Sequence, residues 1–397
     1  MSSAEVVSSL RADYTLDTMP DNECDLSCCH NISLTEAESY RYPGGQIILI
    51  TICLPIIFGI GMLGNIAFIF VAFRIKSMRT ITNRYLVNLA ISDILFLTGA
   101  IGDKVWKYMK SPILKDDSPI GAIGCVLVYF ISDMAYFASL IFVTVVSIDR
   151  YFAVCRPQDR KNMIKTKSER VIFASWVASC LLASLLIPAN ADFSTFCFKW
   201  PSVEPYIRWK SQISFCFPYE DWIADFATGL QTVPFFITFV LNVYLYICII
   251  RGLDKSIKRM SQHGVTSDKD KRIRKQIAQM LVVNGVAFFC LLAPFELGSL
   301  LQLIASIRGG STYTYVIRNS LVRSYVMFLA RMLSYINSAV NPLIYTAMCG
   351  RYREAFKRTF VPNACQRSLE PAEYSSYRST LRKSANDKQT ATEGVAL

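Results

Sequence analysis

Seven long blocks that are nearly free of charge constrain the fold of this chain more than any other feature of its sequence. A helix needs about 20 apolar residues to cross the hydrocarbon core of a bilayer, and each block approaches or exceeds that length. Backbone polar groups in lipid must be satisfied within the segment, so the blocks predict helices rather than strands. The predicted spans are Tyr42–Phe73, Tyr85–Gly102, Ser118–Ile148, Val171–Ala191, Phe226–Ile250, Gln276–Phe295 and Ser324–Gly350.

Basic residues set the predicted orientation of these spans. The net charge is +12, and 52% of the residues are hydrophobic, which is more apolar than a typical water-soluble protein. Lys and Arg concentrate in the loops after the first, third and fifth spans and in the tail, whereas the segment before the first span is acidic. Because basic loops face the cytoplasm, we expect an extracellular N-terminus and a cytoplasmic C-terminus. The charge therefore indicates membrane topology, and no nucleic-acid partner is expected.

Two patterns support an extracellular N-terminus. Asn31-Ile32-Ser33 is an N-glycosylation acceptor, which has meaning only in a luminal or extracellular segment. Six of the thirteen cysteines also fall in the predicted extracellular segments, where disulfides are permitted. These are Cys24, Cys28, Cys29, Cys125, Cys197 and Cys216.

Five polar residues inside four of the predicted spans are candidates for function, because such groups are costly in lipid. One of them is a carboxylate, and the hydroxyl and amide oxygens of the others could join it around a small hard cation. Simple pairing between neighbouring helices is the plainer interpretation. The five residues are Asn65, Asp93, Ser139, Asn337 and Asn341.

Short motifs occur in order along the spans. They are Gly64-Asn65 in the first span, "NLAISD" ending at Asp93, Cys125 at the outer end of the third, "DRY" at Asp149–Tyr151, Trp176 in the fourth, Pro234 in the fifth, Phe288 and Pro294 in the sixth, and Asn341-Pro342-x-x-Tyr345 in the seventh. In this order they resemble the rhodopsin-like, or class A, G-protein-coupled receptors, most of all neuropeptide receptors of the thyrotropin-releasing-hormone, neuromedin U and ghrelin group.

The resemblance implies an all-α membrane protein, a seven-transmembrane helix bundle with a short amphipathic eighth helix and a β-hairpin in the second extracellular loop. It divides the chain into an extracellular tail (1–45), the seven-helix domain (46–349), helix eight (350–362) and a disordered cytoplasmic tail (363–397). It also implies a multi-pass receptor of the plasma membrane, and neither an enzyme nor a cofactor-dependent protein.

The resemblance further assigns roles within the bundle. The five polar residues above would hold an allosteric sodium ion at rest and repack on activation. Arg150 would pair with Asp149 at rest and contact a heterotrimeric G-protein once released, while Tyr345 would swing inward about a hinge at Pro342. The expected activation residues are Asp149, Arg150, Tyr151, Pro234, Phe288, Pro294, Asn341, Pro342 and Tyr345.

The segment after the seventh span predicts an amphipathic helix on membrane lipid, because Tyr352, Phe356 and Phe360 recur four residues apart. Cys365 just beyond it is a palmitoylation candidate. The tail is rich in Ser, Thr and Tyr, which is typical of a disordered, phosphorylatable segment. The resemblance implies receptor kinases and arrestin as its partners.

The second extracellular loop, roughly residues 192–219, holds two β-rich runs, Phe193–Trp200 and Tyr206–Phe217, around a turn-like "PSVEP". The resemblance implies an open hairpin lid whose second strand is tethered to the top of the third span by a Cys125–Cys216 disulfide. Cys197 is then left over, unless Cys24, Cys28 or Cys29 pairs with it, and the sequence leaves this choice open.

Charged residues in the outer halves of the spans suit a peptide with a charged side chain and a terminal amide or carboxylate better than a lipid. The expected ligand-binding residues are Asp103, Lys104, Asp133, Glu296 and Arg331. Asp133 and Arg331 match binding positions of the thyrotropin-releasing-hormone receptor group. Glu296 and Arg331 could instead simply pair with each other.

A biogenic-amine receptor remains an alternative, whereas an opsin is rejected and a transporter or membrane enzyme is disfavoured. A biogenic-amine receptor would carry Asp at position 132, where this chain has Ser132 beside Asp133. An opsin would need a lysine where Tyr335 stands. A transporter or membrane enzyme would show repeated halves or a catalytic cluster, and neither is visible; both histidines, His30 and His263, lie outside the spans.

Three departures from the family pattern bear on signalling. Leu292 replaces the usual tryptophan of the sixth span, so Phe288 and Pro294 must carry that transition, and a non-signalling ligand scavenger stays an alternative. Asn242 replaces the usual tyrosine of the fifth span, with Tyr244 displaced from that position. Arg274 stands where some members have an acid, so no lock across the bundle to Arg150 is expected.

Overall fold

A computed structural model describes residues 29–156, 166–262, 268–307 and 320–360 of the chain. Several sequence predictions fall outside these residues: the palmitoylation candidate Cys365, the tail, and the possible pairing partners Cys24 and Cys28. The side chain of Arg274 is likewise not described.

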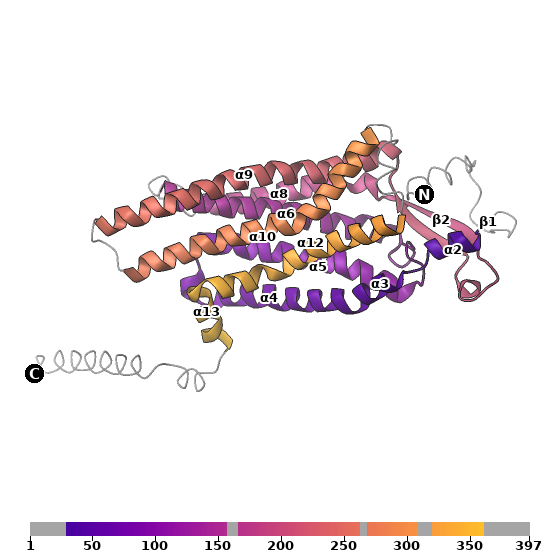
Figure 1. The fold of residues 1–397 in the computed structure, drawn as a ribbon, viewed down its shortest axis with the longest axis horizontal. Coiled ribbons are helices and arrows are strands. Elements are labelled where there is room, and N and C mark those ends of the chain that lie inside the picture. The colour runs from indigo at the N-terminus through magenta and orange to yellow at the C-terminus, as the bar shows by residue number, and fades with distance from the viewer. Residues whose placement is uncertain (1–28, 157–165, 263–267, 308–319, 361–397) are drawn as a thin grey trace, which may run out of the picture.

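Long helices run side by side and form a single bundle, as Figure 1 shows. The first is preceded by α3 (Gly44–Ile48) and a π-helical turn, Leu49–Cys53. Helix α5 packs against α6 and α4, and α12 packs against α10 and α4, which closes the bundle. The long helices are α4 (Leu54–Arg74), α5 (Ile81–Lys110), α6 (Gly121–Cys155), α8 (Thr166–Ser184), α9 (Asp221–Gln262), α10 (Asp268–Ile307) and α12 (Ser320–Met348).

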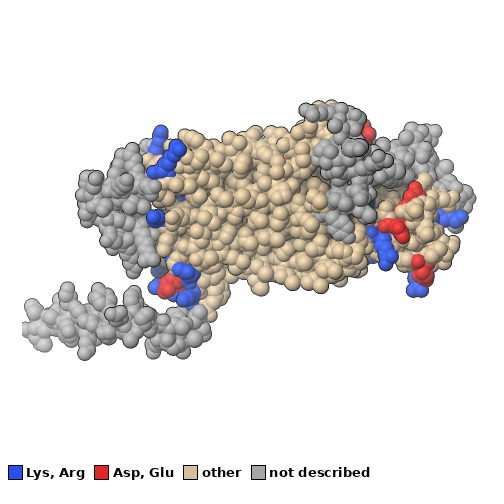
Figure 2. All heavy atoms as spheres, in the orientation of Figure 1, with Lys and Arg blue, Asp and Glu red and all other residues tan. Residues whose placement is uncertain are grey.

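Length and composition allow six of the described helices to cross a membrane. The remaining long helix, α12, carries the polar residues of the predicted seventh span and packs within the bundle. Figure 2 shows a broad uncharged band between two charged ends, with Lys and Arg gathered at the end that holds α13. The predicted helical membrane bundle is therefore confirmed.

The predicted second and sixth spans end too early, because the helices that contain them continue past a charged residue. Helix α10 extends beyond Glu296 to Ile307, and α5 extends beyond Asp103 to Lys110. A break in the apolar pattern marks the approach to water, but the backbone hydrogen bonds of a helix do not require it to end there. The structure thus adds one or more helical turns at the outer end of the bundle.

A small sheet and a short helix cover the outer end of the bundle. Strand β1 (His30–Asn31) pairs in parallel with β2 (Asp192–Lys199), which pairs antiparallel with β3 (Gln212–Phe217). The second strand begins at Gln212 rather than at the predicted Tyr206, because residues Tyr206–Arg208 form a 3-10 turn (η5). The sequence did not predict β1.

We call β1, β2, β3, helix α2 (Leu34–Ser39) and the loop 111–120 the extracellular cap. Ser33 begins α2 with a reciprocal capping box, and its backbone N–H and hydroxyl hydrogen-bond Glu36 and lower the pKa of that carboxyl. An apolar cluster joins α2 to the hairpin. Its buried members are Ile32, Ala37, Tyr40, Ile113, Phe198, Tyr206, Ile213 and Phe215.

Two disulfides fasten the cap. One joins Cys125, at the outer end of α6, to Cys216 in β3. The other joins Cys29 to Cys197 in β2, which resolves the choice that the sequence left open. The N-terminal segment is therefore stapled to the hairpin rather than hanging free of it.

Helix α13 (Gly350–Phe360) lies against the opposite end of the bundle. Its Tyr352 is buried and donates a hydrogen bond from its hydroxyl to Asn83 Oδ1 at 2.6 Å. The ring of Phe360 packs near Phe70 of α4, with 6.1 Å between centroids. The arginine Arg351 also bonds the backbone carbonyl of Ser77. Tyr352 of the predicted apolar face thus docks on the bundle, whereas Phe360 stays 53% exposed.

Candidate ligand pocket and activation core

A half-buried carboxylate, Asp133, and a buried one, Glu296, connect three helices below the extracellular cap. Asp133 of α6 accepts a hydrogen bond from Gln231 Nε2 of α9 at 2.7 Å. Tyr136, one turn further along α6, donates its hydroxyl to Glu296 Oε1 of α10 at 2.7 Å. The same hydroxyl lies 3.4 Å from the backbone oxygen of Gln231, so α6, α9 and α10 meet in one polar network.

Arg331 approaches this network from α12 without pairing with its acids. Its guanidinium carbon lies 4.5 Å from the ring centroid of Phe295, and its side chain is exposed. Glu296 is 1% exposed, and its Oε2 has no hydrogen-bond partner in the described part of the chain. Glu296 and Arg331 therefore do not form the ion pair that the sequence left possible. A buried carboxylate oxygen without a donor favours a bound group that supplies one.

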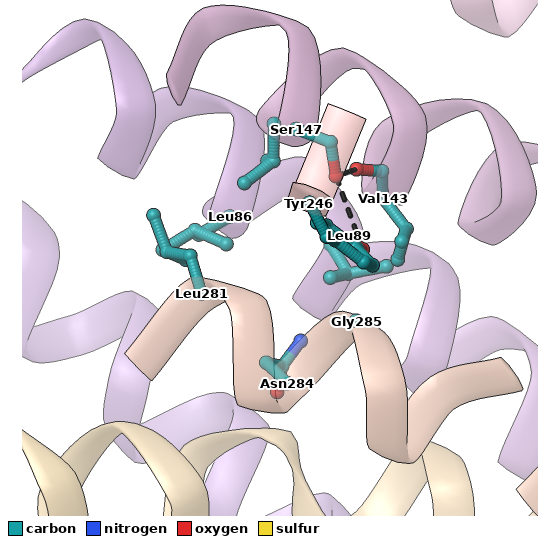
Figure 3. A pocket seen from close by; sticks show the side chains of 9 residues that line it. Leu86, Leu89, Val143, Ser147, Tyr246, Leu281, Asn284 and Gly285 are labelled. Carbon is teal, nitrogen blue, oxygen red and sulfur yellow. Dashed lines mark hydrogen bonds between the residues drawn. The ribbon is translucent and has the colours of Figure 1, made fainter. Parts of the chain in front are cut away.

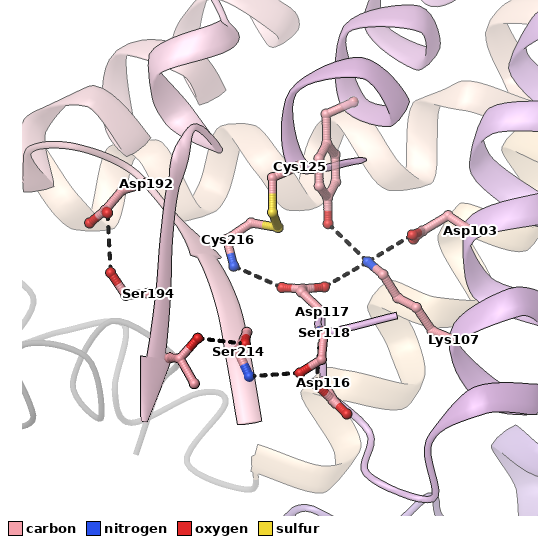
Figure 4. The surroundings of a disulfide bond; sticks show 12 residues. Asp103, Lys107, Asp116, Asp117, Ser118, Cys125, Asp192, Ser194, Ser214 and Cys216 are labelled. Carbon is pink, nitrogen blue, oxygen red and sulfur yellow. Dashed lines mark hydrogen bonds and ion pairs between the residues drawn. A yellow bond between two sulfur atoms is a disulfide. The ribbon is translucent and has the colours of Figure 1, made fainter. Parts of the chain in front are cut away.

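Asp103 and Lys104, also expected at the pocket, belong to a separate cluster nearer the cap. Lys107 Nζ lies 2.7 Å from Asp103 Oδ1 and 2.7 Å from Asp117 Oδ1 (Figure 4). Lys104 Nζ lies 3.9 Å from Asp103 Oδ2. The sequence analysis missed Lys107 and Asp117. The four-residue spacing from Asp103 to Lys107 on one helix face could have pointed to the first of these ion pairs.

The five polar residues predicted at the centre of the bundle are all buried. Asn341 Nδ2 donates to Asp93 Oδ2 at 2.7 Å, and Asn65 Nδ2 donates to the backbone carbonyls of Gly61 and Ser338, each at 2.9 Å. These contacts connect α4, α5 and α12. The Ser139 hydroxyl lies 3.0 Å from that of Ser92, which connects α6 to α5.

Three acceptor oxygens at this centre have no hydrogen-bond donor among the described residues. They are Asp93 Oδ1, Asn65 Oδ1 and Asn337 Oδ1. One carboxylate oxygen and two amide oxygens form the kind of donor set that suits a small hard cation. The residues present therefore fit a sodium ion.

The cytoplasmic end holds the "DRY" residues in a polar cluster. Arg150 Nη2 lies 3.2 Å from Asp149 Oδ2, and the same oxygen accepts a hydrogen bond from Thr82 Oγ1 of α5 at 2.6 Å. Tyr151 packs against an apolar cluster formed with Tyr246 and Ile249 of α9. Asp149 thus joins α6 to α5 and also pairs with Arg150, the next residue along α6.

Apolar side chains fill the layer between the pocket and the centre. Phe288 is 1% exposed and packs edge-on against Phe289, with 5.3 Å between centroids. Leu292, at the position of the usual tryptophan, is buried in the same core. Pro234, Pro294 and Pro342 each lie inside a long helix, where each removes one backbone donor. Tyr345 is also buried, and its hydroxyl has no hydrogen-bond partner in the described residues.

The sequence analysis also missed Tyr246. Its hydroxyl lies 3.1 Å from Ser147 Oγ of α6, beside a small cavity of about 10 Å³ (Figure 3). The ring lies so close to Gly285 of α10 that a side chain there would overlap the hydroxyl. Asn242, one turn earlier, is buried and donates to Thr144 Oγ1 at 2.9 Å. A tyrosine of α9 therefore enters the bundle core, one turn beyond the position where the family pattern puts it.

The predicted glycosylation residue Asn31 is exposed in β1, where an attached sugar would have room.

Residues 64–345 match the family 7 transmembrane receptor (rhodopsin family), from the first long helix to Tyr345. The chain belongs to this family of receptors, and it is not an enzyme. It is 27% identical over 388 residues to the human growth hormone secretagogue receptor type 1, covering 94% of this chain and 95% of that receptor.

Two further relatives agree with this family membership. The human thyrotropin-releasing hormone receptor is 28% identical over 367 residues, with 83% of this chain and 82% of that receptor covered. Somatostatin receptor type 5 of Rattus norvegicus is 26% identical over 337 residues, with the same shares covered. The chain is thus a multi-pass membrane protein that resembles these receptors along most of its length.

Proposed function

We propose that this chain is a plasma-membrane receptor that binds an extracellular peptide between its helices and activates a heterotrimeric G-protein. The observation that carries the proposal is the polar network of Asp133, Gln231, Tyr136 and Glu296, which joins three helices directly below the cap. A bound group that changes these contacts changes the packing of α10, which continues to the opposite end of the bundle.

The chemistry of the pocket favours a peptide with both a donor and an acceptor group. Glu296 Oε2 lacks a donor, so it suits an ammonium, a guanidinium or an amide N–H. Arg331, held over Phe295, offers a fork of N–H donors in the plane of its guanidinium, which suits a terminal amide or carboxylate. Asp103 and Lys104 would meet the peptide nearer the cap. Three relatives whose names give a hormone, a hormone secretagogue and somatostatin as ligands support this class.

We further propose that Asp93, Asn65, Ser139, Asn337 and Asn341 hold a sodium ion in the resting state. The bound ion would supply a positive charge to the acceptor oxygens that lack donors. On activation Asn341 and Tyr345 would repack about Pro342. Helices α9 and α10 would then shift at Pro234 in α9 and at Phe288 and Pro294 in α10.

At the cytoplasmic end we assign the coupling function to Arg150, with Asp149 and Tyr151. Asp149 accepts both Thr82 and Arg150, so a shift of α5 relative to α6 changes the environment of the arginine. The released guanidinium would then contact the G-protein. Receptor kinases and arrestin would bind residues 363–397. Palmitoylation at Cys365 would anchor the chain beside helix α13, and Asn31 would carry a glycan.

The test is calcium release in cells that express the chain with a promiscuous G-protein. The cells are challenged with amidated and free-acid neuropeptides beside biogenic amines. A peptide response that Asp133→Ala or Arg331→Ala weakens, and that Asp221→Ala at the exposed start of α9 leaves intact, supports the proposal.

The amine receptor and the scavenger make different predictions in the same assay. An amine response that Asp133→Asn abolishes would favour the amine receptor, although the Asp133 carboxylate already accepts Gln231 and the Ser132 hydroxyl donates to the carbonyl of Val128 in its own helix. Saturable peptide binding with no signal would favour the scavenger.

A further inference from the structure

The outer edge of strand β3 is covered by the loop that follows α5. Asp117 N donates to the backbone oxygen of Ser214 at 2.8 Å, and Ser214 N donates to Ser118 Oγ at 3.1 Å. Cys216 N donates to Asp117 Oδ2 at 2.9 Å. An uncovered strand edge would leave these backbone groups to water or to another strand. Asp117 therefore holds β3 through both its backbone and its side chain.

Lys107 connects this loop to the transmembrane bundle. Its ammonium lies 2.7 Å from Asp117 Oδ1 and 2.7 Å from Asp103 Oδ1, and it donates to the Tyr129 hydroxyl at 3.4 Å (Figure 4). The side chains of Lys107, Asp103 and Asp117 are 9%, 6% and 15% exposed, so the ion pairs are largely shielded from water. Removing one partner of a shielded pair is far more costly than removing a surface charge.

We propose that Lys107 is the positioning residue of the extracellular lid, and that it fixes strand β3 relative to α5 through Asp117. The Cys125–Cys216 disulfide joins the β2–β3 hairpin to α6 at one residue, and pairing with β2 orients β3 within the hairpin but not against α5. The bonds to Ser214 and Cys216 act two residues apart on the same edge, which fixes the direction of the strand as well.

Loss of the Lys107 charge would leave the Asp117 carboxylate shielded from water without its cation. Asp117 would turn toward solvent and release Cys216 N, and the edge of β3 would open. Since β3 lies above the proposed ligand pocket, the lid would then admit and release a peptide faster. This last step rests on the proposed function, whereas the tether itself does not.

The test is hydrogen–deuterium exchange of the full chain in lipid nanodiscs, without any ligand. The variants are Lys107→Met, Asp117→Asn and the control Lys110→Met. Asp117→Asn keeps an acceptor for Cys216 N but loses the charge, so it isolates the ion pair. Lys110 lies at the same end of α5, over the ring of Trp106 at 4.8 Å.

We expect amides of residues 212–217 to exchange about tenfold faster in Lys107→Met and in Asp117→Asn, because a charge-assisted contact is lost. The double variant should match the single variants, since both remove the same contact. Lys110→Met should match the wild-type chain. Exchange in α6 should stay unchanged, which separates a tether from a general loss of stability.

Wild-type exchange at residues 212–217 in either variant would overturn the proposal, and so would faster exchange spread through α5 and α6. If Lys107→Met fails to reach the membrane, Asp117→Asn decides alone. Neither result depends on a signalling assay, so failure of the tether is distinguishable from failure of the proposed receptor function.

Discussion

The extracellular cap and the centre of the bundle both bury polar groups, but they satisfy them differently. In the cap, Lys107 lies between two carboxylates, and Asp117 accepts both Lys107 and Cys216 N. At the centre, Asp93, Asn337 and Tyr345 each keep an oxygen with no partner in the described chain. Because an unsatisfied buried group costs about 1–3 kcal/mol, the centre gains from any rearrangement or ion that supplies a partner. The difference suggests that the cap is a fixed frame and the centre is the part that changes.

Arg150→Ala is expected to have the largest effect. Signalling should be lost because the proposed contact with the G-protein is removed, while surface expression should stay near wild type because Arg150 lies outside the apolar core clusters. The measurement is calcium release beside antibody labelling of the cell surface. Arg74→Ala, at the exposed cytoplasmic end of α4, is the matched control. Normal signalling by Arg150→Ala would contradict the proposed role of Arg150 in coupling to the G-protein.

Cys29→Ser should loosen the cap and spare the bundle. Loss of the Cys29–Cys197 link frees the N-terminal segment and should cost the cap about 2–4 kcal/mol. Amides of residues 30–40 should exchange faster, and those of α12 should not. Cys290→Ser, which removes an exposed free thiol, is the control. Faster exchange in α12 would show that the cap and the centre are not separate.

Gly285→Ala should destabilise the bundle by about 1–3 kcal/mol, because the added methyl overlaps Tyr246. The melting temperature of the purified chain measures this. Gly229→Ala, where a methyl would meet Leu303 at an ordinary 3.6 Å, should be nearly neutral. Adding Tyr246→Phe should recover part of the loss, and additive losses would argue against the clash.

Much of the fold was predictable from the sequence, because uncharged blocks and loop charges are local patterns. The amphipathic pattern of α13 was predictable for the same reason, but its hydrogen bond to Asn83 was not. Strand β1 was not, since two residues carry no periodic signal and the strand depends on pairing with β2. The Lys107–Asp117 ion pair was not predictable because it depends on the path of the loop after α5. Tyr246 enters the core because Gly285, on another helix, makes room.

The sodium proposal gives a smaller, salt-dependent effect. The chain should be more stable in sodium chloride than in choline chloride by about 1 kcal/mol at sodium concentrations several times the dissociation constant. Asp93→Asn should remove that difference, because the amide cannot supply the negative charge. The measurement is thermal unfolding at equal ionic strength. A sodium effect that survives in Asp93→Asn would place the ion elsewhere.

Tyr352→Phe should have the smallest effect. It removes one hydrogen bond to Asn83 but keeps the ring that packs on Phe68 and Tyr345, so the cost should be about 1 kcal/mol. Amides of α13 should exchange a few times faster, with the rest of the bundle unchanged. No change would mean that ring packing alone docks this helix.

The most direct test of the central claim is hydrogen–deuterium exchange of the full chain with and without a nucleotide-free G-protein. The account predicts altered exchange at residues 284–294 of α10 and 337–345 of α12, with residues 30–31 and 212–217 of the cap unchanged. Altered exchange in the cap with no change at the centre would contradict it, since the cap would then be the moving part and the polar centre a static core.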